Sequence, residues 1–203
     1  SNAFAFGFPA SPHPFMFDGA TCVVSGGKIQ VHAKKGEPLP GEWAVDKDRQ
    51  VVTDAQEAED ILATAAFTEG EQKGGGVLTL GGSNEENSNY KGMGNSIVIE
   101  LLTGILAQGS ISADTVSGKH DFSQFVMVLN PAFFGDPEVL KKDATSMLDR
   151  IRQLEHIPGK EIWVPGDREY RLLAENKEKG VTIDEKTYQE MKEIGTELGI
   201  DVP

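Results

Sequence analysis

Apolar residues alternate with small or polar residues in several short stretches of the chain, and this alternation predicts β-strands. Residues 4–9 alternate until Pro9, and residues 122–130 alternate until Pro131 stops them. Shorter apolar runs end close to a glycine or a proline, as strands commonly do. The predicted strands are residues 4–9, 15–17, 77–80, 122–130 and 162–164, with at most a short strand at 43–45.

Helical spacing and capping residues predict five helices. Asp54 can cap a helix that carries Glu57 three residues later, and Asp136-Pro137 places a proline at the first position of another helix. Residues 95–108 are apolar on most faces, so this helix is expected to lie buried against a sheet. The predicted helices are about 55–65, 95–108, 137–154, 167–179 (ended by Gly180) and 185–199 (capped by Asp184), whereas residues 28–33 fit either a helix or a strand.

Strands and helices alternate along the chain, which predicts an α/β fold with a mixed β-sheet covered by helices. The 203 residues suffice for one domain, or for one domain with an added lobe. Ser1-Asn2-Ala3 (1–3) is interpreted as a tag remnant and excluded. We expect residues 4–130 to form a cofactor-binding domain and residues 131–203 to form a helical segment that completes the fold.

The charge and the cysteine content narrow the possible partners. A net charge of −13 repels phosphate backbones, so nucleic-acid binding is not expected. The single cysteine, Cys22, excludes an intrachain disulfide and fits a cytoplasmic protein. The longest apolar stretch, residues 97–107, contains Glu100 and is far shorter than the roughly 20 residues that cross a bilayer, so no membrane partner is expected. An acidic chain that binds an anion needs backbone amides or a few well-placed cations.

Familiar nucleotide-binding and metal-binding motifs do not occur in this sequence. Neither Gly27-Lys28 nor Gly118-Lys119 is followed by the serine or threonine of a phosphate-binding loop. Gly92-Met93-Gly94 lacks the third glycine of the Rossmann fingerprint. No two of the four histidines lie three or four residues apart on one helix, so no metal site is predicted.

Two predicted strand-to-helix turns combine glycine with a cation. The stretch Tyr90-Lys91-Gly92-Met93-Gly94 precedes the apolar helix, where glycine lets a ligand approach the backbone and the helix start favours an anion. Gly166-Asp167-Arg168 begins another helix, and Arg168 adds a planar donor for phosphate. On these residues alone, an ordinary helix start is the more frequent explanation for each turn. Asp18, after an aromatic strand, either orients a histidine or caps a turn.

A series of motifs resembles the malate/L-lactate dehydrogenase family, which also holds ureidoglycolate, sulfolactate and diketogulonate enzymes. The matching stretches are Phe4–Pro9, Phe17–Thr21, Gly26–Lys28, Lys35–Pro40, Trp43–Asp46, Thr53–Asp54, Leu80–Gly82, Tyr90–Gly94, Leu129–Phe134, Val164–Gly166, Arg171–Asn176 and Gly180–Asp184. They follow the family's order and spacing over nearly the whole chain, so the series is specific although no single motif is.

The resemblance implies a non-Rossmann NAD(P)-binding fold, a homodimer, and hydride transfer between the cofactor and a small 2-hydroxy or 2-oxo acid. In the family pattern, Asp18 matches a carboxylate that supports the catalytic histidine near the substrate. The residues implied to contact NAD or NADP are Tyr90, Lys91, Gly166, Asp167 and Arg168.

The sequence departs from the family pattern in two ways. Gly19 stands where the family usually has a larger apolar residue, so we expect the substrate wall to differ in shape from the family's usual one. The family's acid/base histidine belongs before Phe4 in the family order, so we expect a chain shortened on its N-terminal side and inactive alone. An alternative of another class is a non-catalytic nucleotide-binding or dimerisation remnant, and an upstream reading frame with a histidine would favour the enzyme. A generic α/β binding module would require the motif series to be a coincidence.

Overall fold

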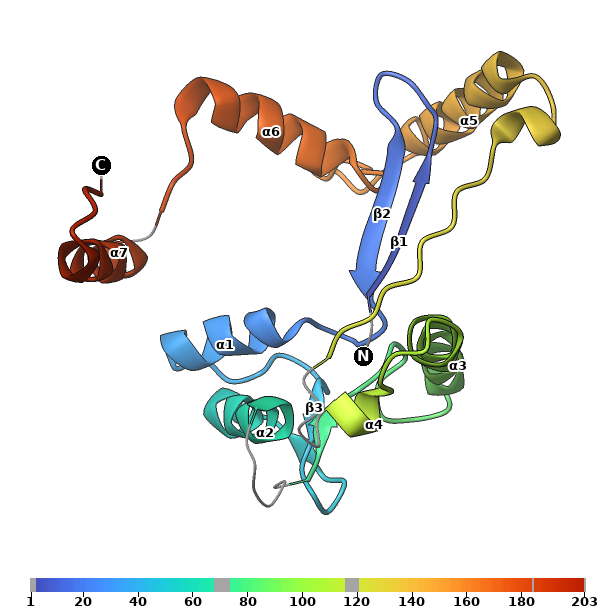
Figure 1. Ribbon diagram of the computed structural model, residues 1–203. Helices are drawn as coiled ribbons and strands as arrows, with labels where there is room; N and C mark the ends of the chain where they lie inside the picture. The colour runs from blue at the N-terminus through green and yellow to red at the C-terminus, as the bar shows by residue number, and fades with distance from the viewer. Residues whose placement is uncertain (1–2, 68–73, 116–120, 184, 203) are drawn as a thin grey trace. The chain divides into compact units, whose positions relative to one another are not determined.

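The computed structural model describes residues 3–67, 74–115, 121–183 and 185–202, and it has the predicted α/β composition (Figure 1). The chain divides into two compact units. The first comprises Ser1–Gly7 with Phe17–Pro137, and the second comprises Phe8–Met16 with Glu138–Pro203. The expected division after residue 130 stays a prediction.

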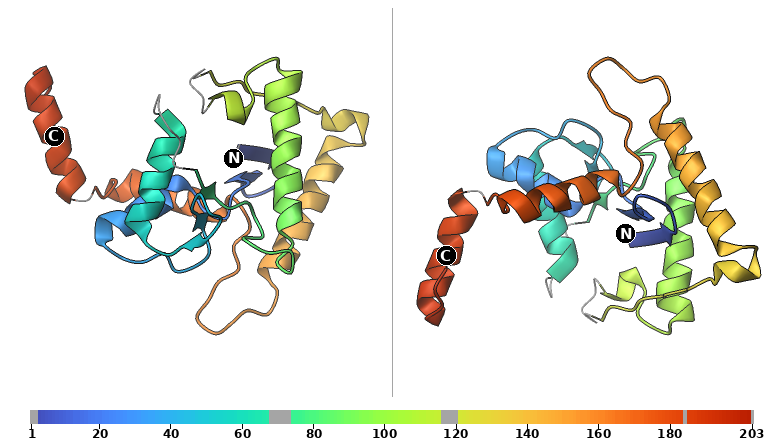
Figure 2. Two further views of the ribbon diagram at one scale, coloured as in Figure 1. Left: turned by 90° about the horizontal axis from the view of Figure 1, so that it is seen from below. Right: turned by 90° about the horizontal axis from the view of Figure 1, so that it is seen from above.

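The core of the first unit lies between two helices and a small sheet. Helix α1 (Gly26–Lys35) and helix α2 (Ala55–Phe67) pack against each other, and Ile29 is fully buried between these elements (Figure 2). Ser25 caps α1, and Gly36 ends it in the left-handed conformation, so the ambiguous residues 28–33 are helical. Asp54 caps α2 as predicted, because its carboxylate accepts the amide of Glu57 at 2.8 Å.

Three two-residue strands form the sheet of the first unit in the order β4 (Val51–Val52), β3 (Ala44–Val45), β5 (Gly76–Val77), and both pairings are antiparallel. The predicted strand 77–80 is therefore shorter than expected. Beyond β5, Thr79 makes only a single bridge with Cys22. The other sheet is two-stranded and joins β1 (Ala3–Phe8) to β2 (Phe15–Ala20), which confirms the first two predicted strands.

The apolar helix differs from the prediction in both start and burial. Helix α3 (Asn89–Glu100) begins six residues earlier than expected and continues as a π-helical turn, η1 (Leu101–Leu106); α4 (Ser112–Asp114) follows. Ile99 is buried, but Ile97 is 52% exposed and Leu101 is exposed as well. The prediction of a buried helix is therefore wrong for most of its apolar residues, because no sheet strand packs over this face in the described chain.

The predicted strand 122–130 is also wrong. These residues form no strand, and Phe122 and Val128 are 83% and 87% exposed. An alternating pattern produces a strand only where a neighbouring strand supplies backbone hydrogen bonds, and no described strand forms such bonds with this segment. A short 3-10 helix, η3 (Pro131–Phe133), follows after Asn130 caps it.

Three helices dominate the second unit: α5 (Pro137–Arg152), α6 (Asp167–Lys179) and α7 (Glu185–Leu198). Each end of these three helices lies within two residues of its predicted position. Asp184, the expected cap of α7, lies outside the described residues. Residues 162–164 form no strand, contrary to the prediction. Val164 instead packs with Ala10 and Leu148 in a small core that anchors the chain before α6.

Candidate functional site

The first candidate turn is the start of α3 rather than a loop before it. Ser88 precedes the helix in the left-handed conformation and makes no side-chain cap, so the amides of Asn89 and Tyr90 have no hydrogen-bond partner in the described chain. Tyr90 and Lys91 are both exposed, and the Lys91 ammonium lies 5.7 Å from the centre of the Tyr90 ring. This helix start therefore offers free amides, a cation and an aromatic face to solvent.

Gly92 has a different role from the one its sequence context suggested. A Cβ at this position would overlap the backbone carbonyl oxygen of Leu80, so the missing side chain lets α3 lie directly against the chain after β5. Gly94 has open space around its would-be Cβ. The surroundings of Gly92 thus indicate close packing against the Leu80 backbone, and not the expected approach of a ligand.

The second candidate turn starts α6. Gly166 is the N-cap residue with φ of 102°, a conformation that favours glycine, and it offers no capping side chain. The amide of Asp167 donates to the Val164 carbonyl oxygen at 3.0 Å, whereas the amides of Arg168 and Glu169 have no partner among the residues that the structure describes. Arg168 is exposed and forms no ion pair with any described residue.

The Asp167 carboxylate faces the protein. Arg152 donates to it from Nε at 2.9 Å and from Nη2 at 2.7 Å, and the amide of Val164 donates at 3.1 Å. The His13 ring, stacked on Tyr170, places Nε2 at 3.2 Å from the same carboxylate. These contacts lower the pKa of Asp167 below its ordinary value, with the Arg152 hydrogen bond as the largest cause, and they raise the pKa of Arg152.

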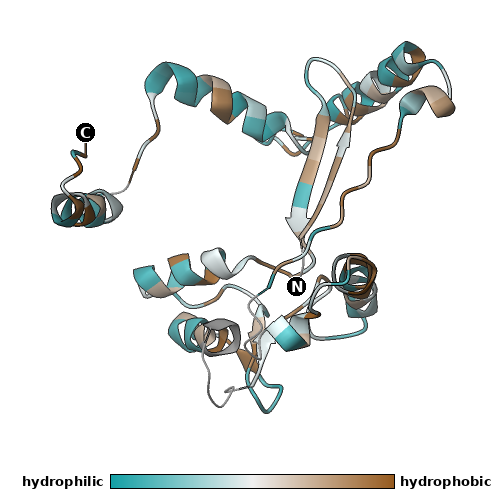
Figure 3. Ribbon diagram, in the orientation of Figure 1, coloured by the Kyte–Doolittle hydropathy of each residue, from teal (hydrophilic) through white to brown (hydrophobic). Residues whose placement is uncertain are grey.

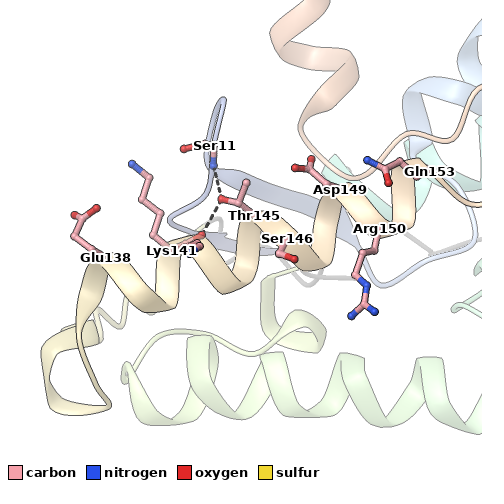
Figure 4. Close-up of a pocket in the computed structure, with 9 residues that line it drawn as sticks. Ser11, Glu138, Lys141, Thr145, Ser146, Asp149, Arg150 and Gln153 are labelled. Atoms are coloured by element: carbon pink, nitrogen blue, oxygen red, sulfur yellow. Dashed lines mark hydrogen bonds between the residues drawn. The ribbon is translucent and has the colours of Figure 1, made fainter.

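Sequence reasoning missed the partners of Asp167. Arg152 lies 15 residues earlier on α5, and His13 lies in the turn between β1 and β2, so no spacing rule connects them with the start of α6. These groups line a hollow of about 620 Å³ in the second unit, together with Trp163 and Arg171. A second hollow, of about 520 Å³, follows the polar face of α5, where Thr145 accepts the amide of Ser11 (Figure 4).

Asp18 lies on β2 and is exposed, with no ion pair to any described residue. Its carboxylate is available to a group outside the described contacts. Tyr90 and Lys91 belong to the first unit and Gly166–Arg168 to the second, so the meeting of the two turns in one cleft stays a prediction. The described residues contain no cluster of three metal-ligating side chains, and none of their helices is both long and apolar enough to cross a membrane.

These features define an α/β protein that presents two open helix starts with one exposed cation each, an arrangement suited to an anionic ligand. The chain belongs to the malate/L-lactate dehydrogenase family, whose sequence profile matches residues 1–192.

The relatives agree with this assignment. Malate dehydrogenase of Pyrococcus horikoshii is 28% identical over 99% of this chain and 53% of its own length. L-sulfolactate dehydrogenase of Methanocaldococcus jannaschii is 30% identical over 100% of this chain and 54% of its own length. The chain thus spans about half the length of the curated relatives it matches, and these relatives are oxidoreductases by name.

Solved structures confirm the fold. The structure of the Pyrococcus horikoshii malate dehydrogenase superposes with a TM-score of 0.77 at 27% identity, covering 100% of this chain and 52% of the other. The malate dehydrogenase of Entamoeba histolytica superposes with a TM-score of 0.83 at 22% identity, covering 100% of this chain and 56% of the other, and shows the fold alone. The predicted malate/L-lactate dehydrogenase type of α/β fold is therefore confirmed.

Proposed function

We propose that this chain is the cofactor-binding part of a cytoplasmic NAD(P)-dependent oxidoreductase that interconverts a 2-hydroxy acid and a 2-oxo acid. The observation that supports it best is the pair of open helix starts in a chain of net charge −13. Free amides and a cation at each start offer donors and positive charge to a dinucleotide phosphate on an otherwise acidic protein, and at α6 the cation Arg168 stands beside the exposed Glu169. Family membership supplies the reaction class.

The residues present at the two helix starts fit a dinucleotide. At α3, Lys91 offers a charge for a phosphate, and the exposed ring of Tyr90 offers a face for stacking. At α6, Gly166 is an N-cap residue without a capping side chain, and the Asp167 carboxylate accepts the Val164 amide. Arg168 offers a planar guanidinium to a pyrophosphate or to a 2′-phosphate. The bound cofactor would supply or accept the hydride.

The substrate-side role falls to Asp18. Its carboxylate is exposed and has no ion-pair partner among the described residues, so it is able to hold a histidine in the tautomer and orientation that proton transfer needs. The three histidines described in this chain lie elsewhere: His13 contacts Asp167, His32 lies edge-on to Trp43 at 5.3 Å between ring centres, and His156 is exposed beside the hollow at Arg152 and Asp167. We therefore expect the 203-residue chain to be inactive alone. Oxidation of NADH with a 2-oxo acid at a turnover above about 1 per second would contradict this.

Titration of NADH fluorescence with the purified chain tests the cofactor site. Lys91→Ala and Arg168→Ala are each expected to raise the Kd about 10-fold, the effect of losing one charge-assisted contact. Lys179→Ala, in the last turn of α6, removes another exposed cation and should change the Kd less than about twofold. Equal affinities in all four proteins would mean that both turns are ordinary helix starts.

The same titration with NADPH separates two functions of Arg168. If its guanidinium binds a 2′-phosphate, Arg168→Ala weakens NADPH more than NADH, whereas equal losses assign it to the pyrophosphate that both cofactors share.

The role of Asp18 is tested in a protein that carries the full family length. Asp18→Asn should lower turnover about 100-fold or more and leave the NADH Kd unchanged, because its effect passes through the acid/base group. A fall in cofactor affinity with unchanged turnover would contradict this role.

The proposed assembly is a homodimer. Apolar residues follow one another on α3 and η1 and along residues 122–134, which Figure 3 colours largely brown, and many of their side chains are exposed, among them Ile97, Ile105 and Val128. Large exposed apolar surfaces commonly form interfaces. Sedimentation of the chain at tens of micromolar should show association, and a monomer there would contradict the proposal.

A further inference from the structure

The start of α6 is held by a single carboxylate, that of Asp167, which faces Arg152, the His13 ring and the Val164 amide. One oxygen of Asp167 faces Nη2 of Arg152 at 2.7 Å and Nε2 of His13 at 3.2 Å. The other faces Nε of Arg152 at 2.9 Å and the Val164 amide at 3.1 Å. The Asp167 side chain is only 11% exposed, so these contacts are largely shielded from solvent.

Two hydrogen bonds close the turn on itself. The Asp167 carboxylate accepts the amide of Val164, and the Asp167 amide donates to the carbonyl oxygen of Val164. Between them, Gly166 lies so close to the chain of β2 that a Cβ would stand 3.3 Å from the Met16 amide nitrogen. The conformation of residues 164–167 therefore depends on an ionised, correctly oriented Asp167.

Arg152 supplies that orientation. Its planar guanidinium binds the carboxylate through two parallel hydrogen bonds, which fix the plane of the carboxylate as well as its charge. Asp149, one turn earlier on α5, accepts Nη1 of Arg152 at 2.7 Å and holds the guanidinium in place. The pKa of Asp167 is lowered mainly by Arg152, so the carboxylate stays charged while this contact lasts.

We propose that Arg152, on α5, is a positioning residue for cofactor binding. Through its two hydrogen bonds to Asp167, it sets the direction in which the Arg168 side chain and the free amides of Arg168 and Glu169 face the cofactor. Arg152 does not itself contact the cofactor, because its donors are directed at Asp167 and Asp149. The inference rests on the proposed function of the turn at Gly166–Arg168.

A double-mutant cycle on the purified chain, read by NADH fluorescence titration, tests this role. Arg152→Ala should raise the NADH Kd about 10-fold, the same as Arg168→Ala. The Kd of the double variant should be about equal to that of either single variant. Arg152→Lys keeps the charge but loses the two parallel hydrogen bonds, so its NADH Kd should lie within about threefold of the wild-type value.

The matched control is Arg150→Ala, an exposed arginine two positions away on α5, which should bind NADH within about twofold of wild type. Far-UV circular dichroism checks that each variant is folded at the titration temperature. If Arg152→Ala does not fold, Arg152→Lys carries the test, and a Kd equal to that of wild type then overturns the proposal.

The outcomes separate the two proposals. Weakened binding in Arg168→Ala together with unchanged binding in Arg152→Ala overturns the positioning role and leaves the cofactor site standing. Fully additive losses in the double variant also overturn it, because independent effects would not pass through one turn. A wild-type chain that binds neither NADH nor NADPH overturns the cofactor site and the positioning role together.

Discussion

Helices α1 and α2 begin with a side chain that closes the helix start, whereas α3 and α6 begin without one. Ser25 accepts the Lys28 amide at 3.3 Å, and Asp54 accepts the Glu57 amide at 2.8 Å. At α3 and α6 the N-cap residues are Ser88 and Gly166, and neither caps with its side chain. A capped helix start has fewer donors left for an anion. The difference therefore separates helix starts that serve the fold from those that can serve a ligand.

The two open starts are also held differently. The start of α3 is fixed by backbone contact, since Gly92 lies directly against Leu80. The start of α6 is fixed by charge, through Arg152 and Asp167. Backbone contact does not respond to pH or salt, whereas an ion pair does, so the two turns should fail under different conditions.

The largest expected effect tests the backbone contact at α3. Gly92→Ala should destabilise the first unit by about 2–3 kcal/mol, because the new Cβ would overlap the Leu80 carbonyl oxygen and force α3 outward. Gly94→Ala, two residues later in open space, should instead stabilise the helix by up to about 1 kcal/mol. Urea unfolding followed by circular dichroism measures both. Equal midpoints for the two variants would show that α3 does not lie against residue 80.

A smaller effect tests the comparison of capped with open starts. Asp54→Ala should cost about 1 kcal/mol, since it leaves the Glu57 amide without its acceptor. Ser88→Ala should cost less than about 0.5 kcal/mol, because Ser88 caps nothing. The same urea experiment gives both values. A loss at Ser88 as large as that at Asp54 would mean that α3 is capped after all.

The smallest effect is confined to acid pH and tests the ion pair between Arg152 and Asp167 at the start of α6. The folded-state pKa of Asp167 is lowered, so its contribution to stability is present above the unfolded-state pKa and is lost as the pH falls through the folded-state value. Unfolding midpoints measured from pH 6 down to pH 3 should therefore fall more steeply for wild type than for Asp167→Asn. Parallel slopes would show that Arg152 and Asp167 do not stabilise the folded unit through their charges.

The sequence predicted elements that carry their own boundary signals. Helix α6 begins at Asp167 and ends before Gly180, as predicted, because a first-turn acid and a terminal glycine are local features. Residues 122–130 have equally clear alternation and yet form no strand, since a strand needs a partner and alternation does not show whether one is present.

The candidate site follows the same rule. Lys91 and Arg168 could be selected from the sequence because each accompanies glycine at a helix start. The ion pair between Arg152 and Asp167 could not be selected in this way. It joins two helices, and tertiary packing decides which of their residues meet. Gly92 was correctly singled out as special, but only the neighbouring Leu80 backbone explains the reason.

The two tryptophans give the two compact units separate optical signals. Trp43 is buried in the core of the first unit, and Trp163, 43% exposed in the second, has the Arg171 guanidinium 5.2 Å from its ring centre. Trp43 should therefore emit at shorter wavelength than Trp163. Trp163 lies three residues before Gly166, so an NADH whose phosphates bind at the proposed turn would lie close to it, and tryptophan emission overlaps the absorption of reduced nicotinamide. Excitation of Trp163 in a Trp43→Phe background would then report cofactor arrival by energy transfer, without a label.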